Sequence, residues 1–264
     1  MDTADSRDAH AVELLNADLF GEHDAILYYL THAWTVARQH GHEILEIAYD
    51  EMRHFKWLAH TIVELGGTPD LKPPVVGPVT DIQAALQKDV DAEIHAIDQY
   101  QEHIEQIGIE PVRALLKRIV VDEQDHLRQF RELLDQTHGE PGQVERPEKE
   151  VSRVAAQLQD TIRIEYQQML AYLMRSFIET HSREMGLDME ERSIDEMRHM
   201  GWMGKRMGQW GLQPKFPAVD IGNVAPAEEE AIYRDVREWA REAMPSMLPT
   251  IDRILAQEEY HVTT

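Results

Sequence analysis

One segment of the chain occurs twice, and this repeat limits the fold more than any other sequence feature. Residues 50–69 and residues 195–214 share the sequence Asp-Glu-Met-Arg-His and then, at identical spacings, a tryptophan, a glycine and a proline. The later positions are Trp57, Gly66 and Pro69 in the first segment and Trp202, Gly211 and Pro214 in the second. Recurrence of so many residues in register indicates an internal duplication of one structural unit.

Each copy is predicted to form four helices. Apolar residues recur at helical spacing along the first half, for example Leu15, Leu19 and Ile26. The predicted helices are 9–38, 42–65, 81–107 and 111–138 in the first half and 151–182, 188–210, 226–243 and 247–262 in the second. A proline-bearing connection separates the second and third helix of each half. Four long helices with one long connection in the middle indicate a four-helix bundle with a crossover.

The two halves are separated by a segment rich in helix-breaking residues. Pro141, Gly142 and Pro147 lie there among charged side chains, a composition typical of a domain linker. We therefore predict an all-α protein with one bundle at residues 1–139, a linker at 140–150 and a second bundle at 151–264.

The motif Glu-x-x-His occurs four times. Residues three apart share a helix face, so the carboxylate and the imidazole can point at one ion. A single pair is more often an exposed surface pair, but here the pairs fall on the second and fourth predicted helix of each half. A di-metal site in a bundle needs this motif from each of two helices and one glutamate from each of the other two.

The first and third predicted helices of each half supply the remaining glutamates. The predicted metal ligands are Glu22, Glu51, His54, Glu93, Glu123 and His126 in the first half and Glu165, Glu196, His199, Glu228, Glu258 and His261 in the second. The step from Glu93 to Glu123 equals the step from Glu228 to Glu258, and Glu229 or Glu230 could substitute for Glu228. Because Glu228 lies in a first helical turn and His261 at a helix end, we expect the second site to be weaker or more exposed.

The donor set indicates which metals fit. Carboxylates and imidazoles suit iron or manganese, and the chain has no cysteine thiolate that would prefer softer ions. Without metals, four buried carboxylates would repel one another and be costly to ionise. Two redox ions held side by side can each give one electron to O2 or peroxide at a single site.

At these residues the chain resembles the bacterioferritin branch of the ferritin-like superfamily. The similarity covers both halves, and its most specific segment is Ser-Ile-Asp-Glu-Met-Arg-His at residues 193–199. It implies two tandem ferritin-like four-helix bundles and a ferroxidase centre at the predicted first-half ligands. Tyr29 and Tyr172 match a family tyrosine beside the metals, which hydrogen-bonds a ligand or donates an electron. Packing in the core is the alternative for both tyrosines.

The same resemblance implies a haem site. In bacterioferritin the methionine of this motif ligates haem across a two-fold subunit interface, and Met52 and Met197 are the matching positions. The two halves would then pair as pseudo-symmetric subunits around one haem b. The alternative is that both methionines pack an apolar interface. Assembly of several chains into a homo-oligomer is a further possibility.

The sequence thus predicts a di-iron ferroxidase that oxidises Fe(II) with O2 or H2O2, in iron homeostasis or oxidative-stress defence. The alternatives are another di-metal enzyme, either manganese catalase-like or an oxygenase, and a non-catalytic metal-binding bundle. Rapid oxidation of bound Fe(II) by O2 would separate the first hypothesis from the last.

Charge and composition exclude several other classes. A net charge of −23 argues against a nucleic-acid partner, and it serves either solubility or the attraction of cations. No apolar run approaches 18 residues, so we expect no membrane span. The polar N-terminus does not resemble a secretory signal, and the absence of cysteine suits a reducing compartment. We therefore expect a cytoplasmic protein.

Overall fold

The computed structural model describes residues 2–35, 40–77, 79, 81–137, 151–152, 154–178, 182–222 and 226–263. Every regular element in these ranges is helical. The chain divides into two compact units, Met1–Val144 and Glu145–Thr264. The predicted all-α fold of two four-helix bundles is confirmed. The predicted linker at 140–150 lies outside the described residues.

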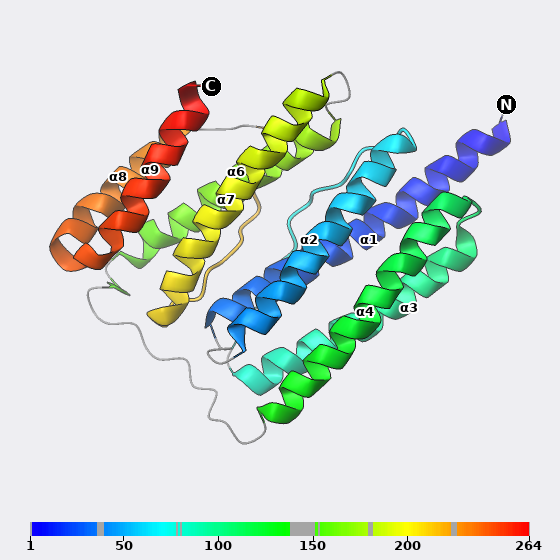
Figure 1. Cartoon of the computed structure of the whole chain (residues 1–264), viewed down its shortest axis with the longest axis horizontal. Helices are drawn as coiled ribbons and strands as arrows, with labels where there is room; N and C mark the ends of the chain where they lie inside the picture. Colours follow the sequence, from blue (N-terminus) through cyan, green and yellow to red (C-terminus); the bar gives the residue numbers. More distant parts are fainter. Residues whose placement is uncertain are drawn as a thin grey trace. The chain divides into compact units, whose positions relative to one another are not determined.

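The first unit is a bundle of α1 (Asp2–Thr35), α2 (Gly41–Glu64), α3 (Ile82–Gln106) and α4 (Glu110–Gln136). Helix α1 packs against α2 and α3, and α4 packs against α3 and α2. The connection from α2 to α3 runs along the bundle, so α3 begins at the end opposite to the one where α2 finishes (Figure 1). This is the predicted crossover.

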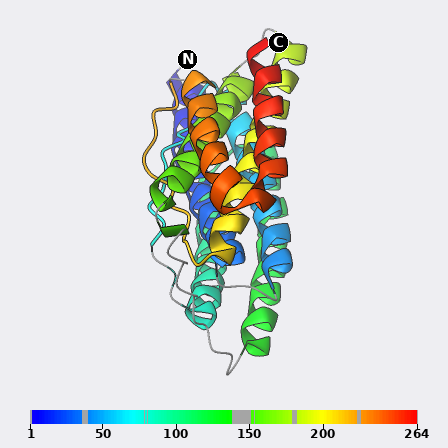
Figure 2. The same cartoon turned by 90° about the vertical axis from the view of Figure 1, so that its left-hand side faces the viewer.

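The second unit repeats this arrangement with α6 (Ala155–Ile178), α7 (Arg183–Gln209), α8 (Pro226–Ala243) and α9 (Leu248–Thr263). Helix α6 packs against α7 and α8, and α9 packs against α8 and α7. Helices α8 and α9 lie side by side (Figure 2) and are joined through a short 3-10 turn, Pro245–Met247. The crossover lies between α7 and α8.

Local sequence signals set several helix ends. Gly66 (φ 78°) and Gly211 (φ 70°) follow α2 and α7 with left-handed backbone, which glycine adopts at little cost. The Asp81 carboxylate caps α3 by accepting a hydrogen bond of 2.8 Å from the Ala84 backbone N–H. The predicted start of α7 at residue 188 is wrong, because the Ser182 hydroxyl accepts a hydrogen bond from the Met185 N–H and starts the helix earlier.

Each unit has its own apolar core. Leu15, Leu19 and Leu27 are fully buried in the first unit, and Met203 and Ile254 are fully buried in the second. Within both units, acids and histidines are also buried, which is rare unless they are paired or bind an ion. None of the described helices combines the length and the apolar character needed to cross a membrane.

Candidate metal centres

The buried acids and histidines of the first unit come together from all four helices. Two overlapping groups form, and within each group the potential ligand atoms lie within 4.8 Å of one another. Glu51 and Glu123 belong to both groups. The first group is Glu22, Glu51, His54 and Glu123, and the second is Glu51, Glu93, Glu123 and His126. Two ions sharing two carboxylates would fit this arrangement.

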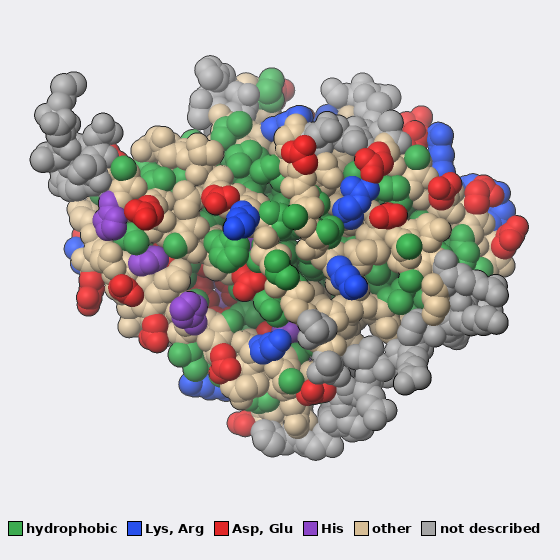
Figure 3. Space-filling model, turned by 180° about the vertical axis from the view of Figure 1, so that it is seen from behind, with side chains coloured by type: hydrophobic (Ala, Val, Ile, Leu, Met, Phe, Trp, Pro, Cys, Tyr) green, Lys and Arg blue, Asp and Glu red, His purple; other side chains and the backbone are tan. Residues whose placement is uncertain are grey.

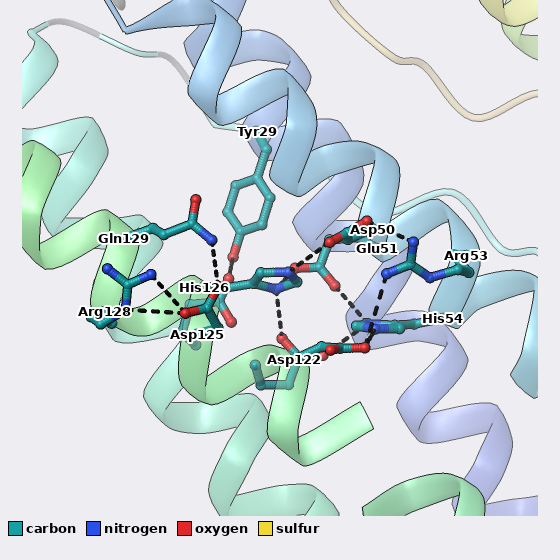
Figure 4. Close-up of polar contacts among 12 residues, drawn as sticks. Tyr29, Asp50, Glu51, Arg53, His54, Asp122, Asp125, His126, Arg128 and Gln129 are labelled. Atoms are coloured by element: carbon teal, nitrogen blue, oxygen red, sulfur yellow. Dashed lines mark hydrogen bonds and ion pairs between the residues drawn. The ribbon is translucent and has the colours of Figure 1, made fainter. Parts of the chain in front are cut away.

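The imidazoles of His54 and His126 lie on either side of the Glu51 carboxylate (Figure 4). The Nδ1 atom of His54 is 3.1 Å from Glu51 Oε2 and 3.0 Å from Glu123 Oε1. The Nδ1 atom of His126 is 3.0 Å from Glu51 Oε1 and 3.3 Å from Glu123 Oε2. Each carboxylate thus turns one oxygen to each imidazole, as a bridging ligand would.

Two aspartates that the sequence interpretation missed hold the outer nitrogens of these imidazoles. Asp122 Oδ2 is 3.2 Å from His54 Nε2, and Asp50 Oδ2 is 3.5 Å from His126 Nε2. Each aspartate precedes a metal-site glutamate and contacts the histidine of the opposite helix (Figure 4). A proton on Nε2 leaves Nδ1 free to bind a metal, and such outer partners fix the ring orientation.

Replacing Asp122 with asparagine is expected to weaken metal binding at the first centre about 10- to 100-fold, because the His54 ring loses its charged partner. Titration of the protein with Fe(II) against a competing chelator, without O2, measures the change. The matched control is Asp125→Asn, since Asp125 lies on the same helix but bonds the exposed Arg128. Equal affinities in the two variants would contradict the role given to Asp122.

Two tyrosines bind the glutamates that are not shared. The Tyr29 hydroxyl donates a hydrogen bond of 2.6 Å to Glu93 Oε1, and the Tyr100 hydroxyl donates one to Glu22. Tyr29 was a predicted site residue, whereas Tyr100 was missed. A sequence signal for it exists, because α1 and α3 carry one pattern at identical spacing: Asp18, Glu22, Tyr29 and His32, and Asp89, Glu93, Tyr100 and His103.

The same pattern places an Asp–His pair on either side of the first centre. His103 Nδ1 is 2.7 Å from Asp18 Oδ1, and His32 Nδ1 is 2.7 Å from Asp89 Oδ1. All four side chains are buried. Helices α1 and α3 are therefore joined by reciprocal polar contacts at four levels, two to the glutamates and two beyond them.

The charges of the first centre are unevenly distributed without metal. Burial, reinforced by the neighbouring Glu51 carboxylate, raises the pKa of Glu22 and of Glu93 well above the usual range. Despite burial, hydrogen bonds from His126 and His54 hold the pKa of Glu51 below its usual range. Burial opposes protonation of His126, but Glu123 and Glu51 raise its pKa to about 10. Metal ions would displace these protons, so affinity should increase with pH.

The atoms that face the centre fit a pair of cations. Glu22 Oε2 and Glu93 Oε2 are buried and have no hydrogen-bond partner among the described residues. A buried carboxylate oxygen without a partner is costly, and a cation would supply the missing partner. Four carboxylates and two imidazoles suit iron or manganese.

A cavity of ≈ 370 Å³ connects this centre with the side of the bundle formed by α1 and α3. It reaches the four metal-site glutamates. Its outer lining includes Asp24, Asp91, Lys88 and His95. Acidic side chains lie around a hollow on the face seen in Figure 3. The first centre is therefore accessible to small molecules and ions from the α1–α3 side.

The second unit builds a comparable cluster. Its members lie within 4.8 Å of one another and are Glu165, Glu196, His199, Glu229 and Glu258. His199 Nδ1 is 3.0 Å from Glu258 Oε1, and His261 Nδ1 is 3.5 Å from Glu196 Oε1. The Tyr233 hydroxyl donates to Glu165, as Tyr100 does to Glu22. One outer partner differs, because His199 Nε2 contacts the neutral Gln257 at 3.3 Å.

The structure corrects one predicted ligand. Glu229, and not Glu228, faces the second cluster. The Glu228 side chain is half exposed and forms an ion pair with Arg163. One residue turns a helix by about 100°. Since the connection between α8 and α9 is not a copy of the one between α3 and α4, equal spacing to Glu258 did not identify the inward-facing residue.

The expectation of greater exposure holds only at the end of α9, where His261 is more exposed than His126, and weaker binding stays a prediction. Glu165, Glu196, His199 and Glu229 are fully buried, and His261 is 8% exposed. Arg192 ties down the end of α9 by donating a hydrogen bond of 2.6 Å to the His261 carbonyl. Tyr172 lies beside His261, with ring centroids 6.3 Å apart. Burial raises the pKa of Tyr172 to about 12, against the influence of Arg192.

The two predicted haem ligands lie outside these clusters. Met52 on α2 and Met197 on α7 are both partly exposed within their own units. Haem binding between the two halves stays a prediction from the sequence.

Comparisons with known proteins find matches to part of this chain. Residues 12–139 match the family described as Ferritin, ferritin-like domain. The X-ray structure of Desulfovibrio desulfuricans bacterioferritin, described with its diiron site, is 24% identical, covers 56% of this chain and 98% of its own, and has a TM-score of 0.50. A ferritin-like, diiron-carboxylate protein from Bacillus anthracis is 28% identical, covers 51% of this chain and 99% of its own, and has a TM-score of 0.46. No curated protein matches the sequence.

Proposed function

We propose that the protein, whose residues 12–139 match the ferritin-like domain family, is a di-iron ferroxidase that oxidises Fe(II) with O2 or H2O2. The observation that carries the proposal is the pair of overlapping ligand groups sharing Glu51 and Glu123. Two Fe(II) ions bound there would each supply one electron to the oxidant. The bacterioferritin described with a diiron site shares the fold over 56% of this chain.

The residues of the first centre have separable roles in this proposal. Glu51 and Glu123 would be shared by the two ions, while His54 and His126 would each hold one ion. Glu22 and Glu93 would each be a ligand of one ion, and the hydroxyls of Tyr29 and Tyr100 orient these two carboxylates. Tyr29 is also the candidate electron donor beside the metals, and Tyr172 is its counterpart in the second unit.

The cavity between α1 and α3 supports iron as the substrate. Carboxylates from Asp18, Asp24 and Asp91 line it along with Glu22 and Glu93, and such a lining attracts Fe(II). Iron would therefore reach the centre from the α1–α3 side. A role in iron homeostasis or in defence against peroxide follows from this chemistry.

The cavity is also the observation that favours a second candidate, an oxygenase acting on a small organic molecule. Its volume of ≈ 370 Å³ falls in the range of small-molecule pockets. Alanine and tyrosine side chains form part of its wall. Its carboxylate lining favours a cation over an apolar substrate, so ferroxidase is the leading candidate.

Anaerobic titration with Fe(II), followed by addition of O2 and read by absorbance, tests the proposal. Two centres of two ions predict about four irons per chain, oxidised rapidly once O2 is present. Saturation near two would restrict the activity to one unit, and saturation near zero would refute it. Bound iron that O2 oxidises slowly would indicate a non-catalytic bundle. Rapid peroxide dismutation by the manganese-loaded protein would indicate a catalase.

A further inference from the structure

The two candidate centres differ in the residues that line their approach. The helices of the two units can be aligned on their cluster glutamates. Glu22 of α1 then matches Glu165 of α6, and Glu93 of α3 matches Glu229 of α8. Four small residues line the cavity of the first unit: Gly21, Ala25, Ala92 and Ala96. The aligned residues of the second unit are all larger: Ile164, Gln168, Glu228 and Ile232.

Gln168 occupies the interior of the second bundle. It lies three residues after Glu165 and four before Tyr172, and all three side chains are buried, so they share the inward face of α6. Gln168 is fully buried, and neither its Nε2 nor its Oε1 has a hydrogen-bond partner among the described residues. The amide therefore fills space next to the cluster, where Ala25 leaves a cavity in the first unit.

Further contacts cover the outer side of this position. Glu228 forms an ion pair with Arg163, where the first unit has Ala92 and Phe20. The Gln167 side chain donates a hydrogen bond of 2.9 Å to the Asp220 carbonyl in the crossover. Ile164 is fully buried. The α6–α8 side of the second unit is thus filled where the α1–α3 side of the first is open.

We propose that the two centres exchange metal at different rates, because Gln168 and its neighbours close the approach that the first unit keeps open. The first centre takes up and releases iron through the α1–α3 cavity and carries out turnover. The second centre retains its metal. This inference rests on the proposed function, since both centres must bind metal.

Single-centre variants of the full chain isolate the two rates. Glu196→Gln with His199→Gln leaves the first centre, and Glu51→Gln with His54→Gln leaves the second. Each variant is loaded with Fe(II) without O2 and then mixed with an excess of ferrozine, whose absorbance follows the released iron. We expect release from the second centre to be slower by about tenfold or more, equivalent to a barrier difference of ~1.4 kcal/mol.

Reciprocal substitutions then test the cause. Gln168→Ala in the variant that keeps the second centre should accelerate release, and Ala25→Gln in the other variant should slow it, each by about tenfold. Gln168→Met retains the volume without the amide and should leave release slow. Thermal unfolding of every variant shows that the bundles are still folded.

The outcomes separate the two proposals. Equal release rates from the two centres would overturn the inference, as would an unchanged rate in Gln168→Ala. A Gln168→Met variant as fast as Gln168→Ala would show that volume is not the barrier. If neither single-centre variant retains iron, the proposed function itself fails.

Discussion

Replacing Glu51 with glutamine should lower the Fe(II) capacity from about four ions per chain to about two, by removing both ions of one centre. Glu51 faces both imidazoles, at 3.1 Å from His54 and 3.0 Å from His126. It belongs to both overlapping ligand groups. A neutral amide at this position removes one bridging charge and breaks two ligand sets together. Anaerobic titration measures the capacity.

The Glu51→Gln substitution should also lower the affinity of the first centre for Fe(II), and substitution of an exposed glutamate should not. We expect the first centre's affinity for Fe(II) to fall at least ~100-fold, the upper end of what outer-partner substitutions cause. Glu43→Gln, an exposed glutamate of the same helix, should retain all four ions. Glu196→Gln should produce the matching loss in the second unit. A Glu51→Gln protein that still binds four ions would exclude the proposed bridging role.

Metal binding should raise the thermal stability of the protein by about 10 °C or more. Ligand at about 1,000 times its dissociation constant stabilises a folded unit by ~4 kcal/mol, and each kcal/mol moves the midpoint by about 2–4 °C in a domain of this size. The gain arises because cations replace repulsion among buried carboxylates. Unfolding followed by circular dichroism, with Fe(II) under anaerobic conditions and with chelator, measures it.

A near-isosteric variant distinguishes metal binding from general packing. Burial raises the pKa values of Glu22 and Glu93 well above the usual range, so the metal-free site favours the protonated form of both acids. Glutamine resembles the protonated acid, so Glu22→Gln with Glu93→Gln should leave metal-free stability almost unchanged. The metal response of the first unit should disappear. An unaltered response would contradict the ligand assignment.

The same raised pKa values predict a dependence of metal-free stability on pH. The folded state holds protons on Glu22 and Glu93 that the unfolded chain releases above the ordinary glutamate pKa of 4.5. Their contribution is therefore complete below that pH and declines as pH rises toward the folded-state values. Thermal unfolding across a pH series, with chelator present, measures the decline. The double glutamine variant should not show this component of it.

The sequence predicts the helices and most of the candidate ligands because their spacing is set by helix geometry. Glu-x-x-His defines one helix face. Because the motif recurs on matching helices, it also shows at which level of the bundle the ligands come together. It did not reveal that Asp50 and Asp122 hold the opposite histidines, because that contact depends on how α2 and α4 pack. The pattern shared by α1 and α3 was present in the sequence and would have identified Tyr100.

The errors in the metal centres concern places where the second unit is not a copy of the first. Glu228 was favoured by assuming that the connection before α9 has the length of the one before α4, but a 3-10 turn intervenes. Exposure of His261 was expected from its place near the end of a helix, but Arg192 reaches it from α7. Contacts between helices determine which way Glu228 points and how far His261 is buried. The spacing of residues along one helix does not reveal such contacts.

The crosswise pairing of Asp50 with His126 and of Asp122 with His54 also bears on how the bundle finds its native alignment during folding. Each pair joins α2 to α4 at a different level, and both fit only one axial offset of these helices. A slip by one helical turn, about 5.4 Å, would break both pairs and leave the buried Nε2 atoms of His54 and His126 without their aspartate partners. The residues that orient the metal ligands therefore also penalise misaligned bundles, before any ion has bound.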